Sequence, residues 1–437
     1  MADKYKIQGG TQLRGEVNIG GAKNAVLKLM AAAVLAEGET KIYNVPELTD
    51  VGIMLEVING LGVKTSYDKE AKYVSIDASN ITSITAKYEY VSKMRASFTI
   101  LGALVSRCKE AIVALPGGCA IGERRVDFHI KGLEALGAKI KIENGYVHAK
   151  APKLIGADIY LDIPSVGATE NLMLAAILAE GSTRIQNAAQ EPEIIDLANF
   201  LNTMGADIVG AGTSEIIING VKQSDLHPIE YTTIPDRIEA GTFMTAVVAS
   251  KGKAIIKNVF PAHLTFFTDK LIKMGASIKL IEPTAIEVSC KNRLNSLNFV
   301  TQPYPGFPTD LQSMAMALLT TANGVGIITE SLYENRFMQV PHLLRMGADI
   351  HQDRNHAIIK GVKKLTGATV SASDLRAGAS LVVAAIMAEG TSIIENLHHI
   401  DRGYENFDTK LRALGANIVR YSEETEEVKG LTNESRV

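Results

Sequence analysis

The sequence has few cysteines, and their spacing gives no pattern of pairs. Cys108, Cys119 and Cys290 are the three in a chain of 437 residues, and they lie far apart. An odd and widely spaced set does not predict a disulfide framework, which excludes the class of small, disulfide-stapled secreted domains. We therefore expect a reducing, cytoplasmic compartment.

Long hydrophobic runs and an excess of one charge are also lacking. No apolar stretch approaches the roughly 20 residues that span a bilayer, and segment 1–10 has no apolar signal core. The formal net charge is −3, so the overall balance does not draw the chain to nucleic acid or to an anionic membrane. We expect neither a nucleic-acid nor a membrane partner, and the sequence leaves protein partners unknown.

The composition is that of a globular protein too long for one ordinary core. Hydrophobic residues make up 46% of the chain and charged residues 21%. A chain of this length predicts two domains. The C-terminal segment 422–437 is charged and poor in apolar residues, so we expect it to be disordered.

A signature of Leu or Met, then Gly, then Ala or Val recurs six times, roughly every 70 residues. Glycine at this place predicts a helix C-cap, with a short strand after it. The six glycines are Gly62, Gly137, Gly205, Gly275, Gly347 and Gly415. Before most of them, an Ala-, Leu- and Met-rich segment that predicts a buried helix leads into an alternating strand pattern. Each unit therefore predicts helix, strand, connector, helix and strand, with room for further strands.

Six such units divide most simply into two α/β domains of three units each, with a ligand cleft between them. The residues at the starts of the six predicted buried helices are mostly polar. They are Lys23, Arg95, Ser165 with Gly167, Arg237, Asp310 and Arg376. A cation at a helix N-terminus opposes the helix dipole. The recurrence of cations at these helix starts therefore indicates that an anion binds there, held by the cation and by the free N–H groups of the helix.

The connectors between strand and second helix carry a further polar set. Cys119 lies in the glycine-rich segment 115–127, with Arg124 and Arg125 close behind it. Nearby cations stabilise a thiolate and attract anionic substrates, and the glycines permit movement, so this segment predicts a reactive lid loop. The other two connectors carry Glu334 with Arg336, and Asp401 with Arg402.

Taken together, five segments resemble the UDP-N-acetylglucosamine 1-carboxyvinyltransferase family of enolpyruvyl transferases. They are residues 20–25, 115–127, 303–310, 334–337 and 399–404, and the resemblance extends over residues 5–421. It implies two inside-out α/β domains, each of three repeated units. Domain one would combine 1–21 with 235–421, and domain two would span 22–234 and carry the Cys119 loop. It also implies transfer of an enolpyruvyl group from phosphoenolpyruvate to UDP-N-acetylglucosamine, with no metal and no other cofactor.

The resemblance assigns roles to individual residues. Cys119 would be the general acid and Asp310 the base or the group that orients the sugar hydroxyl, although Asp310 could also be a plain helix N-cap. Phosphoenolpyruvate would be held by Lys23, Asn24, Arg124 and Arg402. UDP-N-acetylglucosamine would be held by Arg95, Arg124, Arg125, Val126, Asp127, Phe128, Ser165, Val166, Gly167, Asp310 and Leu332. Arg336, Asp374 and Arg376 would line the cleft, either on the substrates or in structural salt bridges.

Two departures from the family pattern bear on the nucleotide. Arg125 stands where the family usually has proline, which adds a cation and a backbone N–H, and Ile163 with Pro164 stand where some members have a lysine. Two alternatives also stay open: a 5-enolpyruvylshikimate-3-phosphate synthase-like enzyme, and a non-catalytic, UDP-sugar-binding divergent copy. The first is disfavoured because that family has a different signature at the first helix and no loop cysteine.

Overall fold

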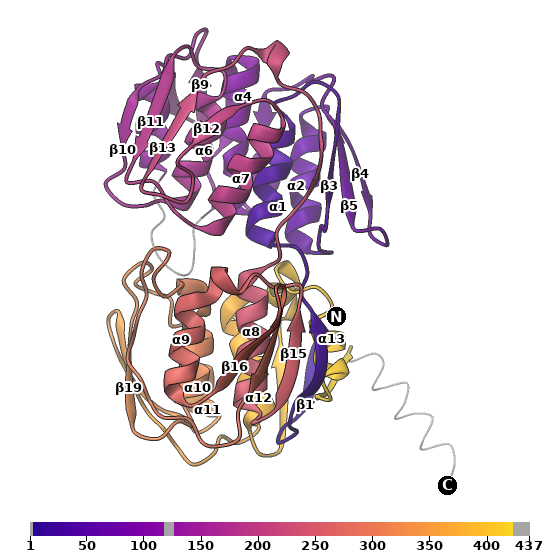
Figure 1. Ribbon diagram of the computed structural model, residues 1–437, viewed down its shortest axis with the longest axis vertical. Helices are drawn as coiled ribbons and strands as arrows, with labels where there is room; N and C mark the ends of the chain where they lie inside the picture. Colours follow the sequence, from indigo (N-terminus) through magenta and orange to yellow (C-terminus); the bar gives the residue numbers. More distant parts are fainter. Residues whose placement is uncertain (1–2, 118–125, 423–437) are drawn as a thin grey trace. The chain divides into compact units, whose positions relative to one another are not determined.

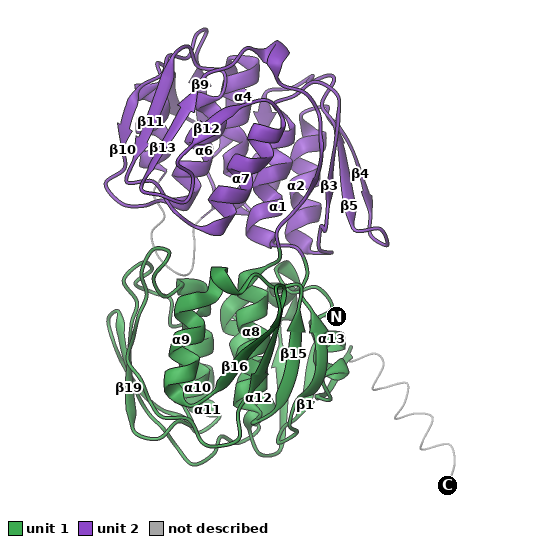
Figure 2. Ribbon diagram, in the orientation of Figure 1, with its two compact units in different colours: residues 1–20, 120–122, 235–437 green, residues 21–119, 123–234 purple. Residues whose placement is uncertain are grey.

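The computed structural model describes residues 3–117 and 126–422 (Figure 1). The described residues form two compact units (Figure 2). Unit 1 contains residues 3–20 and 235–422, and unit 2 contains residues 21–117 and 126–234. The chain leaves unit 1 after Gly20 and returns to it after Ile234, so unit 1 is discontinuous. Within the described ranges, no helix combines the length and the apolar character needed to cross a bilayer.

The described residues of each unit contain three copies of one module, and each copy builds a four-stranded sheet. In every sheet a short edge strand pairs in parallel with the strand that follows the buried helix. The two strands beyond it are antiparallel. In the sheets of modules one to five, the last strand of the module lies inside and the strand before it lies at the other edge. In the sixth sheet, the N-terminal strand of the chain lies inside and the last strand of the module lies at the edge. The repeated helix and strand order expected from the glycine signatures is confirmed, and the edge strands are an addition to it.

Unit 2 contains the first three modules. Module one consists of α1 (Lys23–Ala33), β3 (Glu39–Tyr43), α2 (Thr49–Gly60), β4 (Lys64–Asp68) and β5 (Tyr73–Asp77). Module two consists of β6 (Thr85–Ala86), α3 (Tyr88–Val91), η1 (Arg95–Thr99), α4 (Ile100–Cys108), β7 (Glu110–Ala114), α5 (Asp127–Ala135), β8 (Lys139–Glu143) and β9 (Tyr146–Lys150). Module three consists of β10 (Asp158–Tyr160), α6 (Val166–Ala176), β11 (Ser182–Gln186), α7 (Pro192–Thr203), β12 (Asp207–Val209) and β13 (Glu215–Asn219). After η2 (Gln223–Asp225), β14 (Glu230–Thr232) returns to pair with β3 and completes the first sheet.

Unit 1 contains the other three modules. Module four consists of β2 (Arg14–Asn18), α8 (Arg237–Ala249), β15 (Lys253–Lys257), η3 (Pro261–Leu264), α9 (Thr265–Met274), β16 (Ser277–Glu282) and β17 (Ala285–Ser289). Module five consists of β18 (Phe299–Val300), η4 (Thr309–Leu311), α10 (Gln312–Leu319), β19 (Val325–Thr329), α11 (Val340–Arg345), β20 (Asp349–Asp353) and β21 (His356–Lys360). Module six consists of β22 (Thr369–Ser371), α12 (Leu375–Met387), β23 (Thr391–Glu395), η5 (Leu397–Arg402), α13 (Phe407–Ala413) and β24 (Asn417–Tyr421). The N-terminal β1 (Lys4–Gln8) lies between β23 and β24 and completes the sixth sheet.

Each unit has its apolar helices inside and its sheets outside. Helices α1, α6, α8 and α12 are buried along nearly their whole length, because Ala, Leu, Met and Val occupy all sides of them. Figure 1 shows α8, α10 and α12 in the middle of unit 1, with β19 on one side and β15 and β1 on the other. The two hydrophobic clusters are separate, so each unit has its own core.

Two local signals recur at the ends of these elements. All six glycines of the helix-ending signature have positive φ, from 84° at Gly62 to 115° at Gly275. Gly275 is the C-cap of α9, and each of the other five directly follows the C-cap residue of its helix, so those five lie one residue beyond the predicted cap position. In four of the described modules, a left-handed asparagine ends the strand that follows the buried helix and donates its Nδ2–H to the end of the parallel edge strand. These are Asn44 to Thr233 O, Asn187 to Leu161 O, Asn258 to Ile19 O and Asn396 to Ser371 Oγ.

Candidate active site

The polar helix starts of unit 1 come together around Asp310. Helix α12 packs against both α8 and α10, so the beginnings of these three helices are neighbours. Asp310 lies in η4, directly before α10, and Arg376 lies in the first turn of α12. Arg336 reaches the same point from the loop that precedes α11. The fold therefore gathers three of the predicted site residues, which are far apart in the sequence.

Asp310 is held between two arginines. Arg336 Nη2 lies 2.7 Å from Asp310 Oδ1, and Arg376 Nη2 lies 2.9 Å from Asp310 Oδ2. Both arginine side chains are buried, whereas that of Asp310 is 25% exposed. Burial raises the pKa of Asp310, but the guanidinium groups of Arg376 and Arg336 outweigh it and hold this pKa well below its usual range. Asp310 is thus an ionised acceptor with access to solvent.

These contacts bear on two points that the sequence leaves open. Asp310 is not a helix N-cap, because Pro308 caps η4 and Leu311 caps α10. Arg336 and Arg376 both take part in salt bridges. Asp374 is the N-cap of α12, and its Oδ1 accepts from the backbone N–H groups of Arg376 at 2.8 Å and Ala377 at 3.0 Å. It therefore fixes the start of the helix that presents Arg376.

Arg376 has a second set of contacts on its other side. Its Nη1 donates to Tyr404 OH at 3.1 Å, and its guanidinium carbon lies 5.5 Å from the centre of that ring. The Tyr404 hydroxyl lies 2.8 Å from Thr242 Oγ1, on α8. These contacts leave the guanidinium little freedom, because both of its ends are held.

Arg402 ends the 3-10 helix η5, which is fastened to the sixth sheet. Arg420 on β24 donates two parallel bonds to the neighbouring Asp401, of 2.9 and 2.8 Å, and a third to Asp3. Burial, His398 and Arg402 lower the pKa of His399, so the cation of Arg402 acts at that imidazole. Arg402 therefore lies on an anchored turn of unit 1.

In unit 2, Lys23 begins helix α1. Its Nζ lies 2.9 Å from Asp50 Oδ2, and Asp50 is buried in the first turn of α2. Ala22 is the N-cap and gives the first turn no side-chain hydrogen bond. Asn24 follows in the same turn. The helix start expected to bind an anion thus carries a lysine that a buried carboxylate orients.

A second polar group in unit 2 surrounds the start of α6. Ser165 is the N-cap, and its Oγ accepts from Ala168 N at 3.4 Å. Beside Gly167 lies His129, because a Cβ built at Gly167 would be 3.5 Å from His129 Cε1. His129 is 5% exposed, and its Nδ1 lies 2.8 Å from Asn171 Nδ2. Burial, then the charges of Arg95 and Lys28, lower the pKa of His129 to about 3, so the imidazole is neutral.

Phe128 lies in a groove of unit 2 with a volume of about 160 Å³. Helix α5 contributes Phe128 and Lys131, and the segment from β10 onward contributes Asp158, Tyr160 and Asp162. Val126 is the N-cap of α5 and Asp127 its first residue. The other members of this predicted segment, Cys119, Arg124 and Arg125, lie outside the described residues.

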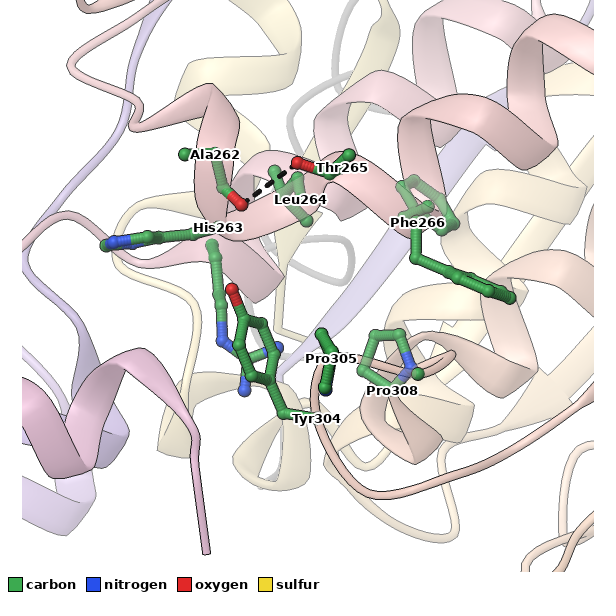
Figure 3. Close-up of a pocket in the computed structure, with 11 residues that line it drawn as sticks. Ala262, His263, Leu264, Thr265, Phe266, Tyr304, Pro305 and Pro308 are labelled. Carbon is green, nitrogen blue, oxygen red and sulfur yellow. Dashed lines mark hydrogen bonds between the residues drawn. The ribbon is translucent and has the colours of Figure 1, made fainter. Parts of the chain in front are cut away.

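A small cavity in unit 1 adjoins the segment that leads to Asp310 (Figure 3). Tyr304, Pro305 and Pro308 line it on one side, and His263 and Phe266 belong to the η3–α9 side. The guanidinium carbon of Arg237 lies 5.5 Å from the Tyr304 ring centre. The cavity measures about 30 Å³, which is room for a water molecule and too little for a sugar nucleotide.

No group of three or more His, Cys, Asp or Glu side chains in residues 3–117 and 126–422 is arranged to hold a metal ion. In the same ranges, the positive charges available to an anion are those of Lys and Arg side chains.

Comparison with known proteins identifies the family. A family model described as EPSP synthase (3-phosphoshikimate 1-carboxyvinyltransferase) matches residues 7–429. The chain is 53% identical over 422 residues to UDP-N-acetylglucosamine 1-carboxyvinyltransferase 2 of Carboxydothermus hydrogenoformans, covering 96% of this chain and 100% of the relative. The UDP-N-acetylglucosamine 1-carboxyvinyltransferase of Gloeobacter violaceus is 50% identical, with 96% and 91% covered. The chain belongs to the UDP-N-acetylglucosamine 1-carboxyvinyltransferase family.

Solved structures agree with this membership. The enolpyruvyl transferase NikO from Streptomyces tendae superposes with a TM-score of 0.87 at 26% identity, covering 96% of this chain and 99% of that one. EPSP synthase from Acinetobacter baumannii has the same fold, with a TM-score of 0.71 at 18% identity and coverage of 96% and 100%. The resemblance drawn from the sequence motifs, and the α/β fold of repeated units that it implies, are therefore confirmed.

Reading the sequence missed three buried polar residues in this member of the UDP-N-acetylglucosamine 1-carboxyvinyltransferase family. Asp50 pairs with Lys23, His129 lies beside Gly167, and Glu330 bonds to the loop that carries Leu332. The sequence around Asp50 and Glu330 does not distinguish them from ordinary surface carboxylates. His129 follows Asp127 at the start of a helix, which is a weak signal without the fold.

The neutral, buried His129 gives unit 2 a specific sensitivity to acid. Its pKa is about 3 in the folded chain, against a reference of 6.5, so the unfolded chain binds the proton first as the pH falls below 6.5. Between pH 6.5 and pH 5, we expect the free energy of unfolding of the wild type to fall by about 2 kcal/mol more than that of His129→Gln. Denaturant unfolding at both pH values measures this, with the exposed His227→Gln as control. An equal loss in His129→Gln and the wild type would contradict a depressed pKa.

Proposed function

We propose that this chain transfers the enolpyruvyl group of phosphoenolpyruvate to the 3-hydroxyl of UDP-N-acetylglucosamine and releases phosphate. The sugar hydroxyl loses its proton and its oxygen adds to C2 of phosphoenolpyruvate, while the methylene carbon takes up a proton. That carbon then loses a proton, the bond from C2 to the phosphate oxygen breaks, and the double bond forms again. This is the first committed step of peptidoglycan precursor synthesis. The proposal is supported by the similarity of the chain, over 96% of its length, to relatives named UDP-N-acetylglucosamine 1-carboxyvinyltransferase.

The observation that carries the chemistry is the ionised Asp310 between two buried arginines. A sugar hydroxyl that enters can donate its hydrogen bond to Asp310, and the partial exposure of this side chain leaves room for it. With its pKa well below the usual range, Asp310 is a weak base in this arrangement. The geometry therefore favours Asp310 as the group that orients the hydroxyl. It removes a proton only if its contact with Arg336 or Arg376 loosens.

The anionic parts of phosphoenolpyruvate need cations that are already in place. Asp50 holds Lys23, and the Asp401–Arg420 pair anchors the turn that carries Arg402. Asn24 and Arg124 complete the set by family resemblance, and Cys119 supplies the proton for the methylene carbon. The reaction involves no change of oxidation state, so the proposal needs no redox cofactor, and the family resemblance implies no metal ion.

The UDP-sugar is assigned to unit 2 on two grounds. The start of α6 presents the N–H groups of Val166 and Gly167, and a helix N-terminus favours a diphosphate. The groove beside Phe128 offers apolar and polar surface for the nucleoside. By family resemblance, Arg95 and Arg125 add positive charge for the nucleotide, and Leu332 and Asp310 contact the sugar. We further propose that residues 1–21 with 235–421 form one domain and 22–234 the other, and that the enzyme works in the cytoplasm.

Phosphate release from phosphoenolpyruvate tests the proposal. We expect the wild-type chain to release phosphate with UDP-N-acetylglucosamine and not with shikimate 3-phosphate. Release with shikimate 3-phosphate instead would favour the EPSP synthase-like alternative. A folded chain that binds UDP-N-acetylglucosamine by calorimetry, yet releases no phosphate with either acceptor, would be a binding protein and would refute the proposal.

A further inference from the structure

Module five departs from modules one, three, four and six at the end of β19. Where four described modules have a left-handed asparagine that donates to the edge strand, this module has Glu330. Its side chain is buried, with 1% of the residue exposed. Module five is also the one that carries Asp310 and Arg336. The exchange of a neutral donor for a buried acid therefore occurs beside the candidate active site.

Within the part of the chain that the structure describes, the four hydrogen-bonding partners of the Glu330 carboxylate are all donors. Oε1 accepts from Thr301 Oγ1 at 2.6 Å, and from the backbone N–H groups of Leu332 at 3.0 Å and Tyr333 at 3.1 Å. Oε2 accepts from Thr309 Oγ1 at 2.9 Å. This is the pattern of an ionised carboxylate, which can only accept. The group replaces the edge-strand contact of the asparagines, and it also holds two functional segments, the loop of Leu332 and the turn of Thr309.

Thr309 links Glu330 to the arginine clamp. Its Oγ1 also lies 2.9 Å from Arg336 Nη1, and a guanidinium can only donate. The hydroxyl therefore has one possible direction: it accepts from Arg336 and donates to Glu330. The other end of the same guanidinium, Nη2, binds Asp310 Oδ1 at 2.7 Å. A continuous series of bonds runs from Glu330 through Thr309 and Arg336 to Asp310.

We propose that Glu330 is a positioning residue for enolpyruvyl transfer, acting through the Thr309 hydroxyl to fix the Arg336 guanidinium and thereby the Asp310 carboxylate that receives the sugar hydroxyl. The proposal rests on the proposed function for the role of Asp310. A buried carboxylate needs positive charge nearby, and the Thr309 hydroxyl joins it to Arg336. Arg336 in turn cannot rotate away from Asp310 without breaking its bond to Thr309. A small displacement of an orienting group is costly in catalysis, because it misaligns the reacting atoms.

Removal of the Thr309 hydroxyl tests this link. Thr309→Val keeps the shape of the side chain and removes both bonds, so we expect kcat to fall at least about tenfold. We expect Thr309→Ser, which keeps the hydroxyl, to restore kcat to within about threefold of the wild type. Asn258→Ala removes the corresponding scaffold bond of module four, and we expect it to lower the melting temperature while kcat stays unchanged. All rates are taken per folded enzyme, from phosphate release.

A double-mutant cycle separates positioning from a merely structural role. If Thr309 acts through Arg336, Thr309→Val and Arg336→Lys have non-additive effects on kcat, because the second change removes a contact that the first has already loosened. Glu330→Gln is expected to lower kcat as well. With its amide nitrogen toward Leu332 and Tyr333, an N–H faces backbone donors, and with it toward Thr309, the hydroxyl must accept from the amide instead of donating to residue 330. A wild-type kcat in Thr309→Val, equal losses in the Val and Ser variants, or additive effects in the cycle would overturn the proposal. An inactive wild type would refute the proposed function instead.

Discussion

Replacement of Asp310 by alanine is expected to lower kcat by at least about a thousandfold, because it removes the acceptor for the sugar hydroxyl. It also leaves two buried guanidinium groups facing each other. Arg336 and Arg376 are 7% and 4% exposed, so water reaches them poorly. Breaking a buried ion pair by removing one partner costs about 3 kcal/mol or more, and we expect unit 1 to be destabilised by that order.

Asp310→Asn tests whether the charge of this residue matters beyond its shape. The amide retains one oxygen, but its N–H groups must face Arg336 or Arg376, which are themselves donors. We therefore expect the asparagine variant to lose both activity and stability. Phosphate release and thermal unfolding measure the two effects, with the exposed Asp353→Ala as control. An Asp310→Asn variant with the kcat of the wild type would show that neither the charge nor the acceptor pair takes part.

The repeated framework could be predicted from the sequence because its signals are local. Each glycine of the helix-ending signature adopts the positive φ that its position requires, and each apolar segment becomes an inner helix. The parallel edge strands could not be predicted, since β6 and β18 are two residues long and show no alternation. Strand β14 pairs with β3 from nearly two hundred residues away, and no periodicity encodes such a return.

The same distinction between local signals and long-range packing applies to the site residues. Lys23, Asp310 and Arg376 stand at helix starts, a place that can be read from the chain. Their buried partners cannot, because Asp50 and Tyr404 reach them only through the packing of separate elements. The Asp374 carboxylate, which the resemblance places along a cleft, also caps α12, a role that a serine or threonine could perform and that its sequence position alone does not specify. Local sequence therefore marks where the charges lie, and tertiary packing decides what holds them.

Cys119→Ala is expected to reduce phosphate release by at least about a thousandfold, because it removes the proposed proton donor for the methylene carbon. Cys119→Ser should not restore the rate, since an alkoxide is far more basic than a thiolate and its hydroxyl is a poor acid. UDP-sugar binding is expected to persist in both variants, because the Ser165–Gly167 turn and the groove beside Phe128 are unchanged.

The other two thiols provide the matched control. Burial raises the pKa of Cys108 and of Cys290, so neither thiol ionises readily. We expect Cys108→Ala to keep the wild-type rate, and Cys290→Ala to change stability alone. Phosphate release by Cys119→Ala at the wild-type rate would mean that the proton comes from another group. Release that collapses in this variant, with UDP-N-acetylglucosamine still bound, would place the lost step after substrate binding, where the proposed proton transfer belongs.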